Sequence, residues 1–456
     1  MVHQYKNNGY NIVLDVNSGA IHVVDDVTYD VIELFEDNSA KEIIEKLVDR
    51  YPQTEIEEAI QEVNELKDNE ELFTEDTYKE RIIDFKKHQT VVKALCLHIA
   101  HDCNLACRYC FAEEGEYHGR RALMSYETGK QALDFLIANS GSRRNLEVDF
   151  FGGEPLMNWD VVKQLVAYGR EQEKLHDKHF RFTLTTNGVL LNDEIMEFAN
   201  KEMDNVVLSI DGRKEVHDRM RPFRKGAGSY DLIVPKFQKF AESRHQDKYY
   251  VRGTYTHFNT DFSKDVLHLA DLGFKQISVE PVVAQPTDEY ALKESDLPVL
   301  FDEYDRLAAE MVKRNKAGNG FNFFHFMIDL EGGPCVYKRL SGCGSGTEYL
   351  AVTPWGDLYP CHQFVGNEDF LMGNVWDGIK ATDIQDEFKC CNVYAKEKCR
   401  NCFARFYCSG GCAANSYNFH GTITDAYDLG CELQKKRIEC AIMIKAAEAD
   451  MADDAQ

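Results

Sequence analysis

The chain lacks an excess of positive charge, and it lacks any long apolar run. Its 456 residues carry a net charge of −25, which argues against nucleic acid as a partner because phosphate binding needs a surplus of Lys and Arg. No stretch of about 18 apolar residues occurs, so no membrane-spanning helix is predicted. The first residues, MVHQYKNNGYNIVLDVNSG, lack the continuous apolar core of a signal peptide. These absences predict a cytoplasmic protein with neither a nucleic-acid nor a membrane partner.

Cysteine is missing from one long part of the chain and dense in two others. The 224 residues between Cys110 and Cys335 contain none, although the chain has fifteen cysteines. Four of them, from Cys96 to Cys110, precede this gap, and eleven lie between Cys335 and Cys440. Disulfides are reduced in the cytosol, so clustered cysteines there more often bind metal or react. The distribution therefore predicts two separate cysteine centres.

Residues 1–80 are predicted to form a small α+β domain. Apolar residues alternate on both sides of a turn at residues 17–19, which predicts a β-hairpin. Thr54 and Glu57 predict a capping box at the start of a following helix. Residues 81–94 are predicted to be a linker.

Residues 95–320 show strand and helix patterns in alternation. Short apolar segments are separated by amphipathic segments such as 126–138 and 161–173. Six such repeats in about 220 residues predict a parallel sheet, either open and doubly wound or a partial barrel. In both architectures ligands gather at the C-terminal ends of the strands. The predicted strands are centred on Leu95–Ile99, Leu146–Phe151, Phe182–Thr186, Val206–Ile210, Val251–Thr256 and Gln276–Val279.

A cysteine triplet, Cys103-x3-Cys107-x2-Cys110, comes directly after the first predicted strand. Zinc in a structural site needs four ligands, and His98 or His101 offers a fourth. An iron–sulfur cubane held by three thiolates leaves one iron open, as a catalytic cluster requires. The spacing favours the cluster and leaves zinc as an alternative.

Polar and glycine-rich motifs end four of the other predicted strands. They are FFGGEP (150–155), TTNG (185–188), LSIDG (208–212) and SVEP (278–281). Each alone is typical of an ordinary turn, but four at one edge of a sheet beside a cysteine loop favour a binding site. Gly152 and Gly153 are predicted to let the backbone approach a ligand closely, and Glu154 to accept from an ammonium group. The candidates for bonds to ribose hydroxyls are Asn187, Ser209 and Asp211.

Together these motifs resemble those of the radical SAM superfamily. In that family CxxxCxxC, with an aromatic residue before the last cysteine, is the cluster motif. The resemblance implies an α/β fold with a partial (β/α)6 barrel. It also implies that Cys103, Cys107 and Cys110 hold a [4Fe–4S] cluster whose fourth iron binds S-adenosylmethionine.

The same resemblance implies the contacts of S-adenosylmethionine. Glu154, in the Gly152-Gly153-Glu154 stretch, would hold the methionine ammonium, and Tyr109 would contact the adenine. Asn187, Ser209 and Asp211 would lie near the ribose or the carboxylate. Glu280 is a weaker candidate. Cys96 lies inside the first strand and is predicted to be a small core residue.

The C-terminal segment, residues 321–445, is rich in glycine, cysteine and aromatic residues and is predicted to be irregular, with residues 446–456 as a tail. Its cysteines are regularly spaced. Cys343 is followed after twelve residues by Gly356 and after four more by Cys361; then come Cys399-x2-Cys402-x5-Cys408-x3-Cys412 and Cys431. Zinc knuckles are an alternative, but seven cysteines do not fill two four-thiolate sites.

This second pattern resembles the SPASM domain, which carries two auxiliary [4Fe–4S] clusters. The resemblance implies that Cys343, Cys361 and Cys412 hold the first and that Cys399, Cys402, Cys408 and Cys431 hold the second. Cys390, Cys391 and Cys440 have no predicted role. Cys335 is a candidate fourth ligand of the first auxiliary cluster. Without it, one iron is open to a substrate thiolate, and this open site is the favoured interpretation.

SPASM enzymes typically act on peptides or proteins. Residues 1–80 resemble the precursor-recognition element of enzymes that modify ribosomally made peptides, a winged-helix-like domain that takes a leader peptide as an added strand. A structural cap is an alternative, and sparse basic residues disfavour a nucleic-acid-binding winged helix. The three parts together resemble maturases of the SCIFF type. Those enzymes form thioether (sactionine) bonds between a cysteine sulfur and an acceptor α-carbon in a cysteine-rich precursor peptide.

The implied chemistry begins with reduction of S-adenosylmethionine to a 5′-deoxyadenosyl radical, which abstracts hydrogen from the acceptor α-carbon before a cysteine thiolate bonds to it. The implied partners are the precursor peptide with its leader and an electron donor such as flavodoxin or ferredoxin. A runner-up is an anaerobic sulfatase maturase that makes formylglycine. Those enzymes usually have an acidic residue where this chain has His362, and usually lack the leader-binding unit. A non-catalytic zinc or electron-transfer protein would have no use for the strand-end motifs.

The cysteine patterns predict the metal content. Three [4Fe–4S] clusters correspond to about twelve irons per chain, with as much sulfide. Iron and sulfide analysis after anaerobic purification measures this directly. A protein with zinc and little iron would contradict the radical SAM interpretation.

Overall fold

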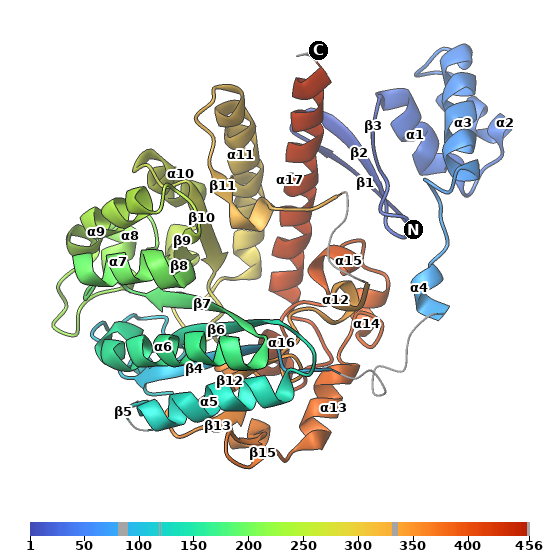
Figure 1. Ribbon diagram of the computed structural model, residues 1–456. Helices are drawn as coiled ribbons and strands as arrows, with labels where there is room; N and C mark the ends of the chain where they lie inside the picture. Colours follow the sequence, from blue (N-terminus) through green and yellow to red (C-terminus); the bar gives the residue numbers. More distant parts are fainter. Residues whose placement is uncertain (81–89, 118, 120, 331–335, 454–456) are drawn as a thin grey trace.

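A computed structural model describes residues 1–80, 90–117, 119, 121–330 and 336–453 (Figure 1). Cys335 and most of the predicted linker 81–94 lie outside the described residues. The chain has an α/β fold with three parts in sequence order. A small antiparallel sheet with helices comes first, a parallel partial barrel follows, and the cysteine-rich region ends the chain.

The N-terminal unit has a three-stranded antiparallel sheet in the order β1 (Val2–Asn7), β2 (Tyr10–Asp15) and β3 (Ile21–Val24). The predicted hairpin is confirmed as β2–β3. Its turn is held by the Asp15 carboxylate, which accepts from the backbone N–H groups of Asn17 (3.1 Å) and Ser18 (2.9 Å). The helices of this unit are α1 (Asp26–Phe35), α2 (Ala40–Leu47), α3 (Gln53–Asp68) and the short α4 (Thr77–Glu80).

The predicted capping box at Thr54 and Glu57 is wrong. Helix α3 begins earlier, at Gln53, and its N-cap is Pro52, which makes no side-chain cap hydrogen bond. Thr54 therefore lies inside the first turn. A capping box exists instead before α2, where the side chains of Ser39 and Glu42 satisfy each other's backbone N–H groups.

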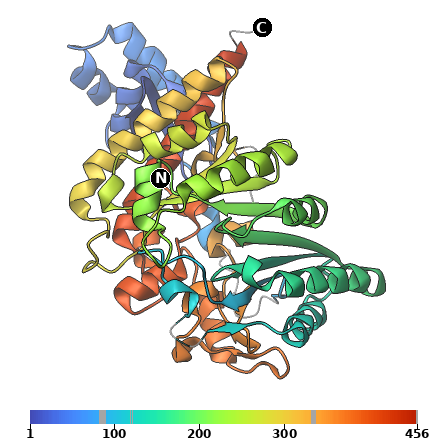
Figure 2. The same cartoon turned by 90° about the vertical axis from the view of Figure 1, so that its left-hand side faces the viewer.

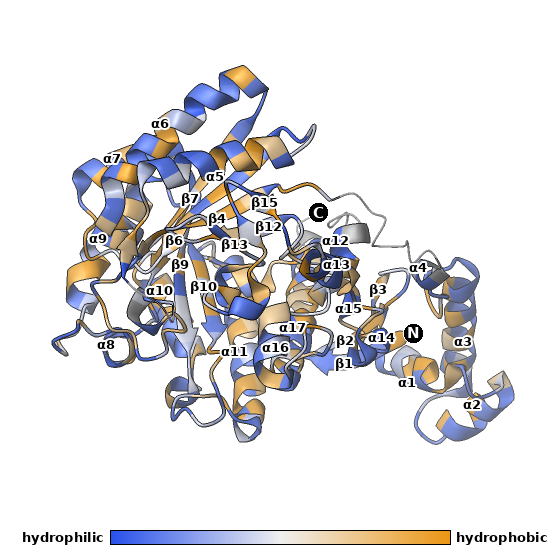
Figure 3. Cartoon of the chain, turned by 90° about the horizontal axis from the view of Figure 1, so that it is seen from below, coloured by the Kyte–Doolittle hydropathy of each residue, from blue (hydrophilic) through white to orange (hydrophobic). Residues whose placement is uncertain are grey.

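All six predicted strands of the barrel are confirmed, and strands that follow one another along the chain pair in parallel. The strands bury apolar residues such as Leu95, Leu97 and Ile99, the first strand is buried along its whole length, and Figure 3 shows the resulting apolar centre. The strands are β4 (Ala94–His101), β6 (Asn145–Gly152), β7 (His179–Thr186), β8 (Met203–Ser209), β9 (Tyr249–Tyr255) and β10 (Gln276–Pro281).

Helices cover the outer face of this sheet (Figure 2). A short strand, β5 (Ala122–Leu123), pairs with the end of β4. The strand ends that carry the predicted motifs all point to the uncovered mouth of the barrel. The covering helices are α5 (Tyr126–Asn139), α6 (Trp159–His176), α7 (Asp193–Glu202), α8 (Lys214–Met220), α9 (Tyr230–Ser243), α10 (Ser263–Asp271) and α11 (Leu297–Lys316).

The sheet extends beyond the predicted barrel at both ends. Strand β11 (Asn322–Phe323) adds to β10, and β12 (Tyr349–Val352) pairs in parallel with the other side of β4. β13 (Asp357–Tyr359), β14 (Gly373–Asn374) and β15 (Gly378–Ile379) continue antiparallel. The cysteine-rich region is thus joined to the barrel through backbone hydrogen bonds that satisfy the edge of β4.

The chain ends in a long helix where a tail was expected. Helix α17 (Asp428–Asp453) packs along α11 and contacts the N-terminal sheet (Figure 1). Tyr5 Oη donates to Glu439 O at 3.0 Å, which ties β1 to α17. No helix within the described ranges is long and apolar enough to cross a membrane. The remaining helices are α12 (Val336–Ser341), α13 (Thr382–Cys390), α14 (Glu397–Arg400), α15 (Arg405–Cys408) and α16 (Ala413–His420).

Candidate cofactor site

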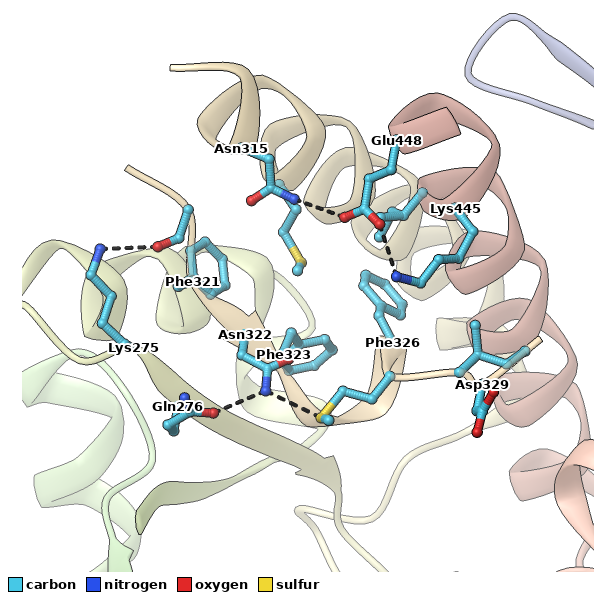
Figure 4. Close-up of a pocket in the computed structure, with 15 residues that line it drawn as sticks. Lys275, Gln276, Asn315, Phe321, Asn322, Phe323, Phe326, Asp329, Lys445 and Glu448 are labelled. Atoms are coloured by element: carbon cyan, nitrogen blue, oxygen red, sulfur yellow. Dashed lines mark hydrogen bonds and ion pairs between the residues drawn. The ribbon is translucent and has the colours of Figure 1, made fainter. Parts of the chain in front are cut away.

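A cavity of about 280 Å³ opens at the C-terminal ends of the barrel strands. Glu154 and Asp211 lie behind its wall, and the other predicted cofactor-site residues line it. These are Cys103, Cys107, Tyr109, Cys110, Gly152, Gly153, Asn187, Ser209 and Glu280. A larger hollow of about 730 Å³ lies between β11, α11 and α17 (Figure 4), but none of the cysteines lines it.

The cysteine loop is held by a segment that the sequence analysis did not single out. The backbone N–H groups of Ala106 and Arg108 donate to Pro222 O and Met220 O, both at 2.9 Å. Arg224 Nη2 donates to Cys103 O at 2.8 Å. The segment after α8, residues 220–224, therefore fixes the loop. The cluster of basic residues in RMRPFR (219–224) is the sequence signal that could have found it.

The environment of the triplet suits thiolate ligands. Leu105 N and Asn187 Nδ2 lie 3.5 Å and 3.6 Å from Cys103 Sγ, where they can donate to a thiolate. Burial raises the pKa of Cys103 to about 12, with a further increase from Glu154, and burial likewise raises the pKa of Cys107 to about 12. A bound cation would offset the free energy needed to ionise these buried thiols, and iron held by three thiolates fits that requirement.

Gly152 and Gly153 are required by the fold itself. A Cβ atom would lie 2.4 Å from Ala100 O at Gly152 and 2.1 Å from Asp102 O at Gly153. The two segments are joined there by hydrogen bonds from Gly153 N to Ala100 O (2.7 Å) and from Glu154 N to Asp102 O (2.9 Å). The close approach predicted for Gly152 and Gly153 is therefore made in this structure to residues 100–102, the part of the chain that leads to Cys103.

Glu154 links three strand ends. Its Oε1 accepts from Leu156 N (3.0 Å) and Thr186 Oγ1 (2.8 Å), and its Oε2 accepts from Asn187 N (2.7 Å). Burial raises the pKa of Glu154 to about 7, and these hydrogen bonds oppose the increase. A cation nearby would favour the carboxylate form, as the predicted ammonium contact requires.

Asp211 has a positioning role in the described contacts. Its carboxylate accepts from Tyr109 Oη (2.7 Å), Arg221 Nε (2.9 Å) and Thr254 N (3.0 Å), and it is fully buried. Arg221 also lies 5.4 Å from the centre of the Tyr109 ring. Asp211 thus orients Tyr109 and Arg221 toward the cavity, while its predicted contact with the ligand stays a prediction.

Two arginines that the sequence analysis missed, Arg221 and Arg252, also line the cavity. Arg252 Nε donates to Glu280 Oε1 at 2.8 Å. Burial acts to raise the pKa of Glu280, but Arg252 outweighs it and the pKa falls to about 2. Glu280 is therefore ionised and already paired. Both arginines suit a ligand carboxylate, because a guanidinium can donate two parallel hydrogen bonds.

Within each of the two predicted C-terminal sets, some cysteines lie close enough to raise the pKa of another member. Burial, and then the nearby Cys412 and Cys343, raise the pKa of Cys361. Burial, and then Cys408, Cys399 and Cys402, raise the pKa of Cys431 to about 12. Among the described residues no three His, Cys, Asp or Glu side chains are arranged to hold a single metal ion. The roles of these cysteines as cluster ligands stay predictions.

The first C-terminal set lies beside the cavity. Cys361 is followed by His362, which lines the cavity with Gln363. The His362 ring lies 5.0 Å from the ring of Phe151 and 5.7 Å from that of Phe111. Burial lowers the pKa of His362 to about 4, so this imidazole is neutral at pH 7. An aromatic wall therefore separates the two cysteine centres.

Comparison with known proteins agrees with this geometry. Residues 97–279 match the family model of the Radical SAM superfamily. Over 312 residues the chain is 23% identical to the radical SAM cyclopropyl synthase TigE of Paramaledivibacter caminithermalis, which covers 62% of this chain and 60% of TigE. This chain thus spans less than two thirds of that relative.

Two solved structures share the fold. The structure of anSMEcpe with bound AdoMet has a TM-score of 0.64 at 19% identity, over 78% of this chain and 99% of that one. The structure of Streptococcus suis SuiB bound to precursor peptide SuiA has a TM-score of 0.51 at 16% identity, over 94% of this chain and 98% of that one. At this coverage the SuiB likeness includes most of the N-terminal unit.

The site makes a prediction about the triplet. Replacing Cys103, Cys107 and Cys110 together with Ala should abolish S-adenosylmethionine cleavage and lower the iron content by about four atoms per chain. The remaining irons should stay, because the C-terminal cysteines lie apart from the triplet. Iron analysis and chromatography of 5′-deoxyadenosine measure both effects. Formation of 5′-deoxyadenosine by the triple variant would contradict the assignment.

Proposed function

We propose that the chain is a radical SAM enzyme with a SPASM-like C-terminal region, and that it installs thioether crosslinks in a ribosomally made, cysteine-rich precursor peptide. The bond would join a cysteine sulfur to the α-carbon of an acceptor residue. The observation that carries this proposal is that His362 and Gln363 line the cavity, because Cys361 directly precedes them along the chain. A substrate sulfur bound there would lie next to the site of radical chemistry.

When bound, the triplet's cluster and S-adenosylmethionine supply a carbon radical that removes a hydrogen atom from the acceptor. Cys103, Cys107 and Cys110 would hold that cluster, and Glu154 the methionine ammonium. Tyr109, fixed by Asp211, would pack against the adenine. Formation of the thioether would require the substrate thiol to lose a proton, its sulfur to bond to the α-carbon and one electron to be removed, and clusters held by the C-terminal cysteines would supply an electron acceptor. Placement and exclusion of water are the protein's share of this chemistry.

The other cysteines would hold two auxiliary [4Fe–4S] clusters. Cys343, Cys361 and Cys412 would hold the first, which we propose is open to a substrate thiolate. The second would be held by Cys399, Cys402, Cys408 and Cys431. A reduced electron donor such as flavodoxin or ferredoxin would supply the electron for each cleavage, which fits a cytoplasmic enzyme.

The N-terminal sheet has an edge that suits a leader peptide. Strand β3 pairs only with β2 among the described strands, none of its residues is buried, and Val23 is 50% exposed. The opposite strand, β1, is instead tied to α17 through Tyr5 and through His3, whose Nε2 lies 2.9 Å from Glu439 Oε1. We propose that the leader adds to β3 as a fourth, antiparallel strand. The structure of SuiB with its precursor peptide supports a peptide partner.

Formylglycine formation is the second candidate, and the 25% identity over 307 residues to the serine-type anaerobic sulfatase-maturating enzyme of Bacteroides thetaiotaomicron favours it. The neutral His362 argues against it, because sulfatase maturases usually have an acidic residue at this position. A second argument against it is the N-terminal unit, which those enzymes usually lack.

Mass spectrometry tests the proposed reaction. Candidate cysteine-rich peptides should lose two hydrogen atoms for each crosslink after anaerobic reaction with reduced enzyme and S-adenosylmethionine. The same number of cysteines should resist alkylation, since their sulfurs are bonded to carbon. The triple Ala variant of the cysteine triplet is the control. Modified peptides that gain an aldehyde would instead support formylglycine formation.

Hydrogen exchange tests the leader site. Adding a leader peptide without its cysteine-rich part should slow amide exchange in residues 21–24, because an added strand protects the edge of β3. Residues 2–7 in β1 should change little, and the cysteine-rich part alone should protect neither strand. Protection confined to other parts of the chain would contradict leader binding at β3.

A further inference from the structure

A second hollow, of about 320 Å³, lies between the N-terminal unit and the rest of the protein. We call it the linker groove. One wall is the turn between β2 and β3, Val16–Gly19, and another is the segment after β11, from His325 to Leu330. Helices α15 and α17 contribute Phe406, Tyr407, Gln434, Ile438 and Ala441, and Tyr78 of α4 and Arg339 and Leu340 of α12 complete the lining.

We propose that the linker groove holds the part of the substrate between its leader and its modified residues, in an extended conformation. This inference rests on the proposed function, since it assumes a substrate with a leader. No described residue lines both the cofactor cavity and the linker groove. The groove would therefore bind the substrate and deliver it to the cavity without taking part in the reaction.

The direction of the strands supports this occupant. Strand β3 runs from Ile21 to Val24, away from the turn at Val16–Gly19. A leader that pairs antiparallel with β3 would enter beside Val24 and leave beside Ile21. The residues that follow the leader would therefore emerge at the turn, which is the wall of the linker groove. A parallel leader would emerge at the far end of β3 and would miss the groove.

The opposite wall of the groove leads to the cofactor cavity. His325 lies in this wall, and its Nε2 is 3.2 Å from Ser278 Oγ on β10. Two residues further along the same strand, Glu280 lines the cavity. His325 Nδ1 also lies 3.4 Å from Arg437 Nη1 of α17. The groove thus reaches from the leader strand to the strand that ends at the cavity.

The groove also offers uncovered apolar surface. Met327 is 56% exposed and Leu330 is 37% exposed, although the nearby Phe323 and Phe326 are buried. Met327, Ile328 and Asp329 also line the larger hollow shown in Figure 4, so the apolar surface continues beyond the groove. Exposed apolar side chains beside polar turn residues such as Asn17 and Ser18 suit an extended peptide, which presents both side chains and backbone groups.

Met327→Arg tests the groove, because it places a charged and longer side chain at an exposed apolar position outside the cofactor site. Leu175→Arg on α6 is the matched control, since Leu175 is 72% exposed and far along the chain from the groove. Met327→Arg should lower kcat/KM for crosslinking the full precursor by about tenfold. Leader affinity, iron content and S-adenosylmethionine cleavage without peptide should change less than about twofold, and Leu175→Arg should behave like the wild type.

Photo-crosslinking gives a second readout that needs no variant of the enzyme. A benzophenone amino acid is placed in the precursor between the leader and the first cysteine. Its products should map to residues 16–19, 325–330 or 434–441. Products confined to the outer barrel helices, or an unchanged kcat/KM for Met327→Arg, would overturn the groove assignment. Failure of the wild-type enzyme to modify any precursor would instead overturn the proposed function, so the two failures are distinguishable.

Discussion

The cofactor cavity depends on the contact between the end of β6 and the chain that leaves β4. Gly153 lies so close to Asp102 that any side chain there would displace the backbone. Glu154 then extends this contact to β7 through Thr186 and Asn187. Three strand ends are therefore fixed relative to one another, and Cys103 begins the cysteine loop directly after one of them. The position of a cluster held by that loop would therefore depend on the backbone contacts of Gly153 and on the side-chain hydrogen bonds of Glu154 and Arg224.

A second set of contacts ties the N-terminal unit to the C-terminal cysteines. Arg405 is 3% exposed, and its Nη2 donates to Asn17 Oδ1 (2.6 Å) and to Asp76 Oδ2 (3.0 Å). The ring of His3 stacks on that of Phe403 at 3.5 Å. Arg405 and Phe403 both lie between Cys402 and Cys408. Because removal of the partners of a buried cation strongly destabilises a protein, these contacts hold the N-terminal unit against the segment between Cys402 and Cys408.

The sequence predicted the elements whose signals are local. The six barrel strands are short apolar runs, four of them end in polar motifs, and Cys103, Cys107 and Cys110 follow the first. Strand β12 was not predicted, because a run of four residues does not indicate which strand it pairs with. Its pairing with β4 is a feature of the folded chain. Helix α17 was also missed, since it is buried between α11 and the N-terminal sheet and its buried residues do not form one stripe. The role of Asp211 depends on Tyr109 and Arg221, which only the fold brings together.

The titration of the cavity residues bears on how a substrate thiol could lose its proton. Among the described residues that line the cavity, Glu280 has a pKa near 2 and His362 has a pKa near 4, so both are weak bases at pH 7. Burial raises the pKa of the Tyr109 and Tyr117 phenols, so neither is ionised. The Glu154 carboxylate lies behind the cavity wall and already accepts three hydrogen bonds. In the reaction that we propose, coordination of the substrate sulfur by a metal ion would lower the pKa of its thiol, so that deprotonation would not depend on Glu280 or His362. An iron held by the proposed set of Cys343, Cys361 and Cys412 would supply this coordination.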